Sequence, residues 1–118
     1  MDLPESRQYK ILLFDFYDAL LTERQREIFI MHHIDDLSLV EIGELKGITP
    51  QAVSDMLKRT ENHLHRYEEH LMIVAKYESR KITAKKINKA LDGLEKTPEN
   101  KAVISKVQNL MEIDFLDM

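Results

Sequence analysis

The feature that most constrains this chain is a pair of helix starts on either side of a glycine. Ser38 and Glu41 form a capping box, in which the serine hydroxyl accepts from the amide three residues on and the glutamate reaches back. Thr49 is a capping residue, and Pro50 suits the first helical position because its missing N–H has no partner there. Gly47 tolerates the left-handed conformation that ends a helix. The pattern predicts two helices joined by a short turn.

Two helices joined by so short a turn pack nearly at right angles, which places demands on their residues. Gly43 supplies the small residue where the second helix crosses the first, and Ile48 follows the turn to fill the angle between them. The second helix needs apolar residues on its inner face, and the chain provides Val53, Met56 and Leu57, with Ala52 at the edge. The joint match predicts a helix-turn-helix.

Composition favours an all-α fold. Three glycines, three prolines and the absence of a convincing hairpin turn argue against a β-sheet protein. No cysteine is present, which excludes disulfides, thiolate metal sites and a cysteine nucleophile. No apolar run is long enough to span a bilayer, and the start of the chain lacks the pattern of a signal peptide. We therefore expect a cytoplasmic protein without membrane insertion.

Helical periodicity extends over most of the chain. One helix is predicted over 6–21, and Thr22 with Gln25 starts a second by a further capping box. A long third helix is predicted from 50 to about 79, with Leu57, Leu64 and Leu71 spaced by seven. A shorter helix capped by Thr83 and a last one starting at Thr97 follow. We expect a helix-turn-helix domain over 1–79, whose long helix serves recognition and dimerisation, and a helical C-terminal extension over 80–118.

The outer face of the helix after the turn is polar. At about 100° per residue, one face opposite Val53 and Leu57 collects polar side chains. These are Gln51, Ser54, Asp55, Lys58 and Asn62, with Arg59 at the margin. Such groups recognise base edges and phosphates in a DNA major groove. The face is a candidate DNA-binding surface, and its alternative is a solvated face used for protein contact.

Charge is unevenly distributed along the chain. The net charge of −4 does not favour nucleic acid, yet residues 76–89 carry six cations against Glu78 alone. They are Lys76, Arg80, Lys81, Lys85, Lys86 and Lys89. The predicted reading helix has only two basic side chains, whereas phosphate attraction normally supplies most of the affinity. This basic stripe is a candidate contact for a nucleic-acid backbone, and its alternative is a solvated helix face.

The motifs together resemble the YlxM-like family of helix-turn-helix proteins. The resemblance rests on four groups of residues over about 9–75: Phe14-x-Phe16-Tyr17-x-x-Leu20-Leu21-Thr22-x-x-Gln25, Asp35-Asp36-x-Ser38-Leu39-x-Glu41-Ile42, Gln51-Ala52-Val53 and Lys58-Arg59-Thr60-Glu61. It implies a fold similar to region 4 of sigma factors and a bacterial DNA-binding regulator of transcription. It also implies a role in the signal recognition particle pathway, with the alternative of an accessory factor that binds the particle's protein or RNA.

Three residues depart from the pattern of that family. Lys46 stands where an apolar residue is usual, with Leu45 one place earlier, so we expect the local core contact to shift. Ser54 replaces a commoner tyrosine on the outward face. Gly43 replaces the usual alanine, at up to about 1 kcal/mol of helix propensity.

Other chemistry finds little support in the sequence. His63 and His70 share a helix face, but the closely spaced ligands of a zinc site are absent. Glu41 is better explained by its capping box than as half of a catalytic pair, and no phosphate loop or nucleophile elbow is present. We expect no enzyme activity, catalytic residue, metal or cofactor. Because symmetric operators match symmetric proteins, we expect a homodimer joined through the long helix or the C-terminal helices.

Overall fold

The computed structural model describes residues 6–113, and their regular structure is helical, with no strand. This confirms the all-α fold class predicted from composition and periodicity. The described residues fall into two compact units, with the boundary between residues 74 and 75.

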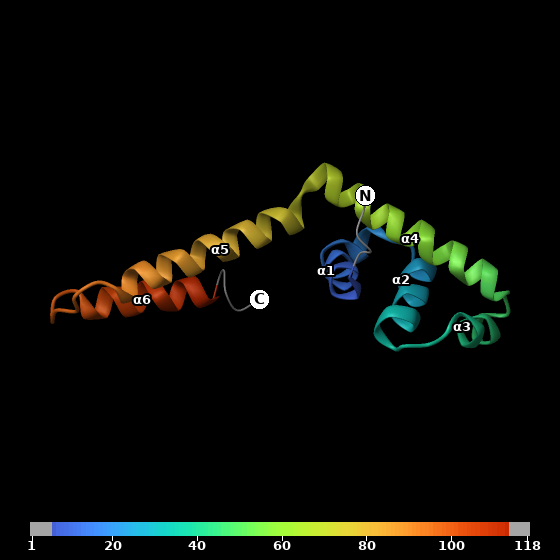
Figure 1. The fold of residues 1–118 in the computed structure, drawn as a ribbon, viewed down its shortest axis with the longest axis horizontal. Helices are drawn as coiled ribbons and strands as arrows, with labels where there is room; N and C mark the ends of the chain where they lie inside the picture. The colour runs from blue at the N-terminus through green and yellow to red at the C-terminus, as the bar shows by residue number, and fades with distance from the viewer. Residues whose placement is uncertain (1–5, 114–118) are drawn as a thin grey trace. The chain divides into compact units, whose positions relative to one another are not determined.

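The first unit is built around one long helix. Its elements in order are α1 (Arg7–Tyr17), a 3₁₀ turn (Asp18–Leu20), α2 (Glu23–Phe29), a π-helical segment (Ile30–Ile34), α3 (Leu39–Lys46) and α4 (Pro50–Leu71). Helix α4 packs against α1, α2 and α3, which lie along one side of it (Figure 1). The long helix is therefore the scaffold that holds the three short ones.

Local sequence signals placed the starts of these helices. Both predicted capping boxes are present: the Thr22 hydroxyl accepts from the Gln25 amide at 3.2 Å, and the Ser38 hydroxyl accepts from the Glu41 amide at 3.1 Å. The first helix ends at Tyr17, earlier than the predicted residue 21, because the chain tightens into the 3₁₀ turn before Thr22.

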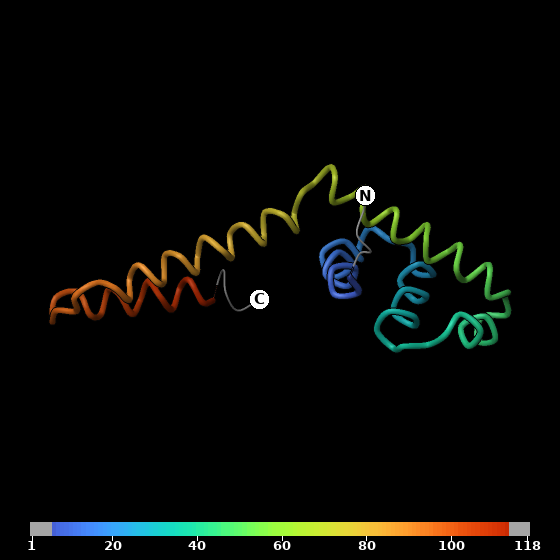
Figure 2. Tube along the Cα trace, in the orientation of Figure 1, coloured from blue at the N-terminus to red at the C-terminus, as the bar shows by residue number. Residues whose placement is uncertain are grey.

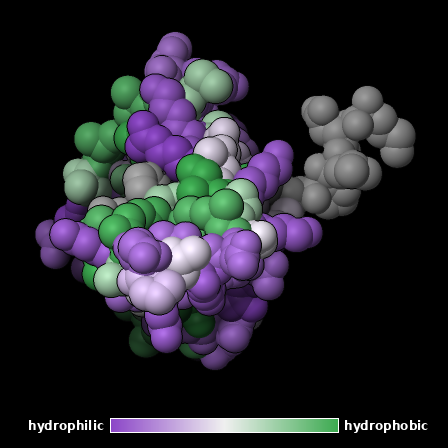
Figure 3. All heavy atoms as spheres, turned by 90° about the vertical axis from the view of Figure 1, so that its left-hand side faces the viewer, coloured by the Kyte–Doolittle hydropathy of each residue, from purple (hydrophilic) through white to green (hydrophobic). Residues whose placement is uncertain are grey.

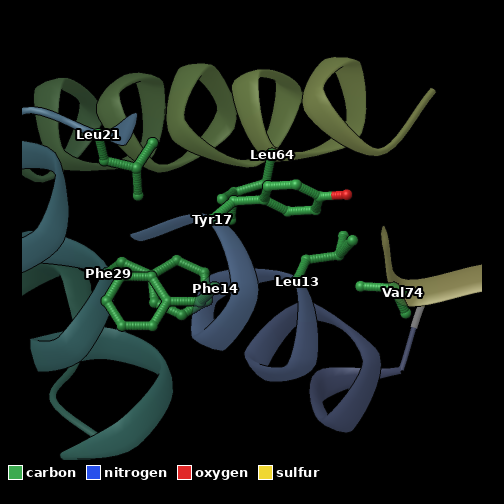
Figure 4. Close-up of a cluster of buried hydrophobic side chains, with 7 residues drawn as sticks. All are labelled: Leu13, Phe14, Tyr17, Leu21, Phe29, Leu64 and Val74. Carbon is green, nitrogen blue, oxygen red and sulfur yellow. The ribbon is translucent and has the colours of Figure 1, made fainter. Parts of the chain in front are cut away.

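One part of the core lies between α1, α2 and α4. Seven buried apolar side chains form it, and Figure 4 shows them: Leu13, Phe14, Tyr17, Leu21, Phe29, Leu64 and Val74. The Phe14 and Phe29 rings stack with their centroids 4.4 Å apart. Phe14 and Tyr17 are thus core residues, whereas Phe16 remains 36% exposed.

The long helix ends sooner than its periodicity predicted. It stops at Leu71 rather than near 79, because Met72 adopts a left-handed conformation with φ of 55°. The Tyr17 hydroxyl donates to Glu68 Oε1 at 2.5 Å and accepts from the Ile73 amide at 3.1 Å. The same carboxylate oxygen accepts from the Val74 amide at 2.9 Å. These bonds satisfy the amides of Ile73 and Val74, which in a continuous helix would have donated to carbonyls of the preceding turn.

The leucines spaced by seven do not form the seam of a coiled coil between two chains. Leu57 and Leu64 are buried in the core of their own unit, together with Thr60. Leu71, the third in the series, is 46% exposed at the end of the helix. The apolar face of α4 is therefore used inside the first unit and is not free to join two chains.

The second unit is a helical hairpin. Helix α5 (Ile73–Asp92) begins at the end of the first unit, and α6 (Lys101–Met111) returns antiparallel beside it (Figure 2). Thr83 lies within α5, so the predicted helix start there is wrong; the helix began ten residues earlier. The last helix begins as predicted around Thr97: its hydroxyl accepts from the Asn100 amide at 3.2 Å, and the Asn100 side chain accepts from the Thr97 amide at 2.7 Å. One turn later the α-helix α6 proper begins at Lys101, whose amide donates to the Thr97 carbonyl at 3.0 Å. Over residues 6–113, no helix combines the length and apolar character required to cross a membrane.

Candidate nucleic-acid interface

The turn between α3 and α4 has the geometry that its glycine predicted. Gly47 ends α3 with φ of 69° and ψ of 34°, in the left-handed region. The amides of Gly47 and Ile48 both donate to the carbonyl of Gly43, the latter at 3.0 Å. Thr49 then caps α4 by accepting from the Ala52 amide at 3.1 Å, and Pro50 occupies the first turn. The chain thus leaves one helix and enters the next within a few residues.

Gly43 lies where the second helix begins to cross the first. A Cβ atom built on it would stand 2.6 Å from the Ile48 carbonyl oxygen and 3.5 Å from the Pro50 nitrogen. Both neighbours are backbone atoms, which cannot rotate away as a side chain can. The small residue therefore permits the close crossing, as the sequence predicted.

The inner side of the crossing is a second part of the core. Its buried side chains are Ile28, Ile42, Val53 and Leu57, and Ile48 and Met56 pack against them. Ile28 comes from α2, Ile42 from α3, and Val53 and Leu57 from α4. Helices α2 and α3 thus fix the direction of α4 at its first two turns.

The opposite side of α4 faces solvent. Of the predicted DNA-binding residues, five are exposed and Ser54 is partly buried at the edge of the face; the exposed ones are Gln51, Asp55, Lys58, Arg59 and Asn62. The Gln51 amide nitrogen donates to the Asp55 carboxylate at 3.1 Å. That bond turns the carbonyl oxygen of Gln51 away from Asp55 and leaves it as an acceptor.

Two cations on this face are not engaged elsewhere. Lys58 and Arg59 are exposed and make no ion pair with another residue of the described range 6–113. Lys46, by contrast, bonds to Glu27 at 2.5 Å, which holds the pKa of that carboxyl below its usual value. Leu45 is 65% exposed, so the expected shift of the core contact onto it is wrong. Lys46 instead bridges α3 to α2.

Arg66 extends the same face and was not among the predicted residues. Steps of four residues connect Lys58, Asn62 and Arg66, which places all three on one side of α4, and Arg66 is exposed. The sequence contained the signal for Arg66, because the four-residue spacing of polar side chains continues beyond residue 62. The predicted set stopped there because only the first turns of a recognition helix usually reach base edges.

A polar contact anchors the middle of α4 to the rest of the unit. His33 Nε2 lies 2.7 Å from Glu61 Oε1, and the Lys10 ammonium lies 3.4 Å from the same oxygen. Burial alone would raise the pKa of Glu61, but the hydrogen bonds and charges of His33 and Lys10 outweigh it and lower that pKa. Glu61 is thus a structural carboxylate, directed away from the exposed face.

The six cations of residues 76–89 all lie on α5. Five are exposed, namely Lys76, Arg80, Lys85, Lys86 and Lys89. Lys81 is partly buried, with its ammonium 5.6 Å from the centre of the Tyr77 ring. At about 100° per residue these cations point in several directions around the helix. Lys81, Lys85 and Lys89, spaced by four residues, come closest to sharing one side, and Lys86 lies about 100° from Lys85.

No metal-binding constellation is found where the chain is described. Among residues 6–113, no three histidine, aspartate or glutamate side chains lie close enough together to hold an ion. The His33 side chain is engaged by Glu61, and His32 Nδ1 lies 2.9 Å from the Leu37 carbonyl oxygen. The histidines near the first helices thus have structural partners.

Comparison with known proteins shows which family the chain matches. Residues 4–107 match the family described as "Putative helix-turn-helix protein, YlxM / p13 like". The chain is 41% identical over 98 residues to a UPF0122 protein of Halalkalibacterium halodurans, covering 83% of this chain and 90% of that protein. It is 39% identical over 98 residues to the UPF0122 protein YlxM of Bacillus subtilis, covering 83% and 89%. A UPF0122 protein of Caldanaerobacter subterraneus subsp. tengcongensis is 46% identical over 83 residues, covering 70% and 71%.

Proposed function

The chain belongs to the YlxM / p13-like family of helix-turn-helix proteins, and we propose that it is a DNA-binding regulatory protein of the bacterial cytoplasm. One observation carries the proposal: the crossing at Gly43 and Gly47 fixes α4 rigidly while its opposite side presents exposed polar side chains. A helix held in this way fits a major groove, whose width admits one α-helix.

The roles of the residues follow from their chemistry. The free carbonyl oxygen of Gln51 and the carboxylate of Asp55 are acceptors, suited to the exposed amino groups of adenine or cytosine. Lys58 and Arg59 are donors for guanine or phosphate, and Asn62 can serve as either donor or acceptor. Arg66, farther along the same face, suits a phosphate at the edge of the groove. Ser54 contributes at the margin.

Selection of DNA from a random pool at several salt concentrations tests the proposal. We expect enrichment of one sequence by the wild-type protein, and loss of at least about tenfold in affinity for it in Lys58→Ala, as expected of a base or phosphate contact. Lys101→Ala is the matched control, because it removes one positive charge from α6 and leaves α4 intact. Absence of any enriched sequence at all salt concentrations would overturn the proposal.

The family resemblance implies an alternative, binding to the protein or RNA of the signal recognition particle through α5. The observation that favours it is the exposure of Lys85, Lys86 and Lys89 on that helix. Charge reversal at Lys85 and Lys86 then abolishes capture of the particle, whereas Gln51→Ala leaves capture unchanged. Capture of the particle that survives charge reversal at Lys85 and Lys86 would count against this alternative.

A further inference from the structure

The helical hairpin of the second unit has very little core of its own. Among its described residues, 75–113, only Ala84 and Ile104 are buried. Two helices alone cannot cover the apolar stripe that each carries, because each shields only one flank of the other. The hairpin therefore leaves apolar side chains in contact with water.

Five apolar side chains of the two helices lie on one side of the hairpin, whereas the exposed Ile82, Leu94 and Ile113 lie outside that group. At about 100° per residue, Ile87 and Leu91 lie to one side of the line that faces α6. Because α6 is antiparallel, the residues on its corresponding side are Val103, Val107 and Leu110. These five residues, here named the hairpin face, form one continuous apolar surface. Figure 3 views the α5–α6 end of the molecule and shows apolar side chains gathered between polar ones.

The opposite side of the hairpin carries polar residues together with the exposed Ile82, and a hydrogen bond there agrees with the orientation of the helices. Gln108 Nε2 donates to Asp92 Oδ1 at 2.7 Å, and both residues fall on the side away from the hairpin face. Exposure on the hairpin face is high: Ile87 is 41%, Val103 61% and Leu110 51% exposed. A contiguous apolar surface rimmed by polar residues marks an interaction site.

We propose that a second copy of this chain covers the hairpin face, so that two hairpins form a four-helix bundle about a two-fold axis. In such a contact each copy supplies the same surface, and four helices enclose the apolar core that two cannot. The proposal goes beyond DNA binding and does not depend on it. Of the two dimer contacts expected from the sequence, the long helix and the C-terminal helices, it favours the C-terminal helices, because the apolar face of α4 is buried within its own unit.

Charge complementarity supports a second copy in the antiparallel orientation. Lys76 and Arg80, near the start of α5, flank the same side as the hairpin face. The connection between α5 and α6, at the other end, carries Glu95 and Glu99 against Lys96. An antiparallel two-fold arrangement brings the basic end of each hairpin beside the acidic end of the other. Like charges at the rim disfavour the parallel alternative.

Sedimentation of the full chain over a range of concentrations tests the proposal. We expect a dimer for the wild-type protein. Val103→Glu with Leu110→Glu should raise the dissociation constant about 100-fold or more, because unpaired carboxylates are strongly disfavoured in an apolar interface. Both positions are exposed in the single chain, so the helices should form normally, which circular dichroism verifies. Ala102→Glu with Asn109→Glu adds the same charge to an exposed side of α6 away from the hairpin face, and should remain dimeric.

A charge exchange tests the antiparallel orientation. Lys76→Glu with Arg80→Glu should weaken the dimer about tenfold, in keeping with exposed ion pairs at an interface rim. Adding Glu95→Lys and Glu99→Lys to that variant should return the dissociation constant to near the wild-type value. Failure of this restoration would overturn the antiparallel arrangement.

Each remaining outcome has a definite meaning. A wild-type protein that is monomeric at every concentration overturns the proposal. If the Val103→Glu and Leu110→Glu variant of such a monomer also melts at a lower temperature, the hairpin face is covered by another part of the same chain, and the proposal is again overturned. A dimer that is unaffected by those substitutions places the contact elsewhere and overturns it as well. DNA binding by a monomer would leave the proposed function standing while this inference fails.

Discussion

At the scale of single residues, Gly47 is the position with the strictest backbone requirement. Its φ of 69° lies in the region that costs a residue with a Cβ atom about 1–2 kcal/mol. No heavy atom lies within 4 Å of a Cβ built there, so the cost of substitution is conformational rather than steric. Gly43 is the reverse case, since its backbone is helical and the limit there is space.

Substitution of Gly47 tests whether its requirement is one of backbone conformation. We expect Gly47→Ala to lower the free energy of unfolding by about 1–2 kcal/mol, and Gly47→Asn to lower it less, because asparagine tolerates the left-handed region. Urea denaturation of the three proteins measures both changes. Equal stabilities for the alanine and asparagine variants would contradict the assignment of strain to the backbone.

Glu61 makes the folded state sensitive to acid. Its pKa in the folded protein lies below the ordinary value of 4.5, since His33 and Lys10 outweigh the effect of burial. The stability from this ion pair is therefore present above pH 4.5 and is lost as pH falls through the lower folded pKa. In Glu61→Gln this contribution is absent at every pH.

Comparing the two proteins by urea denaturation between pH 7 and pH 3 measures the effect. The wild-type protein should be more stable above pH 4.5, and the gap should narrow as the pH is lowered further. Both retain an oxygen that can accept from His33, so the comparison isolates the charge. A gap that stays constant down to pH 3 would show that Glu61 does not titrate differently in the two states.

At the scale of elements, sequence signals succeeded where the cause is local. Ser38 with Glu41, Thr22 with Gln25, and Thr49 before Pro50 act within one turn, and each starts the helix that it predicted. The break at Met72 was missed because its partners are distant: Tyr17 lies in α1, fifty-six residues before the Ile73 amide that it binds. The polar face of α4 followed from periodicity, but the partial burial of Ser54 depends on packing that no single helix reveals.

The break between α4 and α5 can be weakened or strengthened by single changes. Tyr17→Phe removes a buried hydroxyl that bonds both Glu68 and the Ile73 amide, and should cost about 1–3 kcal/mol of unfolding free energy. Met72→Gly should be neutral or stabilising by up to about 1 kcal/mol, because glycine adopts φ of 55° without strain. Urea denaturation measures both. A stable Tyr17→Phe variant would show that the break is held by other contacts.

At the scale of the whole molecule, the proposed recognition helix α4 carries few cations, and the chain has a net charge of −4, which does not favour nucleic acid. A single copy offers Lys58, Arg59 and Arg66 on the exposed face of α4. Because each phosphate contact adds to the dependence of affinity on salt, two copies bound together double the number of such contacts. The proposed dimerisation through the hairpin face and the proposed DNA binding through α4 therefore predict a joint effect on the salt dependence of DNA affinity.

Arg66 provides the measurement, since it suits a phosphate rather than a base. For the wild-type protein on its selected DNA, Arg66→Ala should reduce the slope of log affinity against log salt by about 2, one phosphate for each copy. In the Val103→Glu and Leu110→Glu background, where one copy binds, the same change should reduce the slope by about 1. Lys101→Ala should leave the slope unchanged in both. Equal reductions in the two backgrounds would show that the wild-type protein binds DNA as a single copy, and no reduction in either would remove Arg66 from the interface.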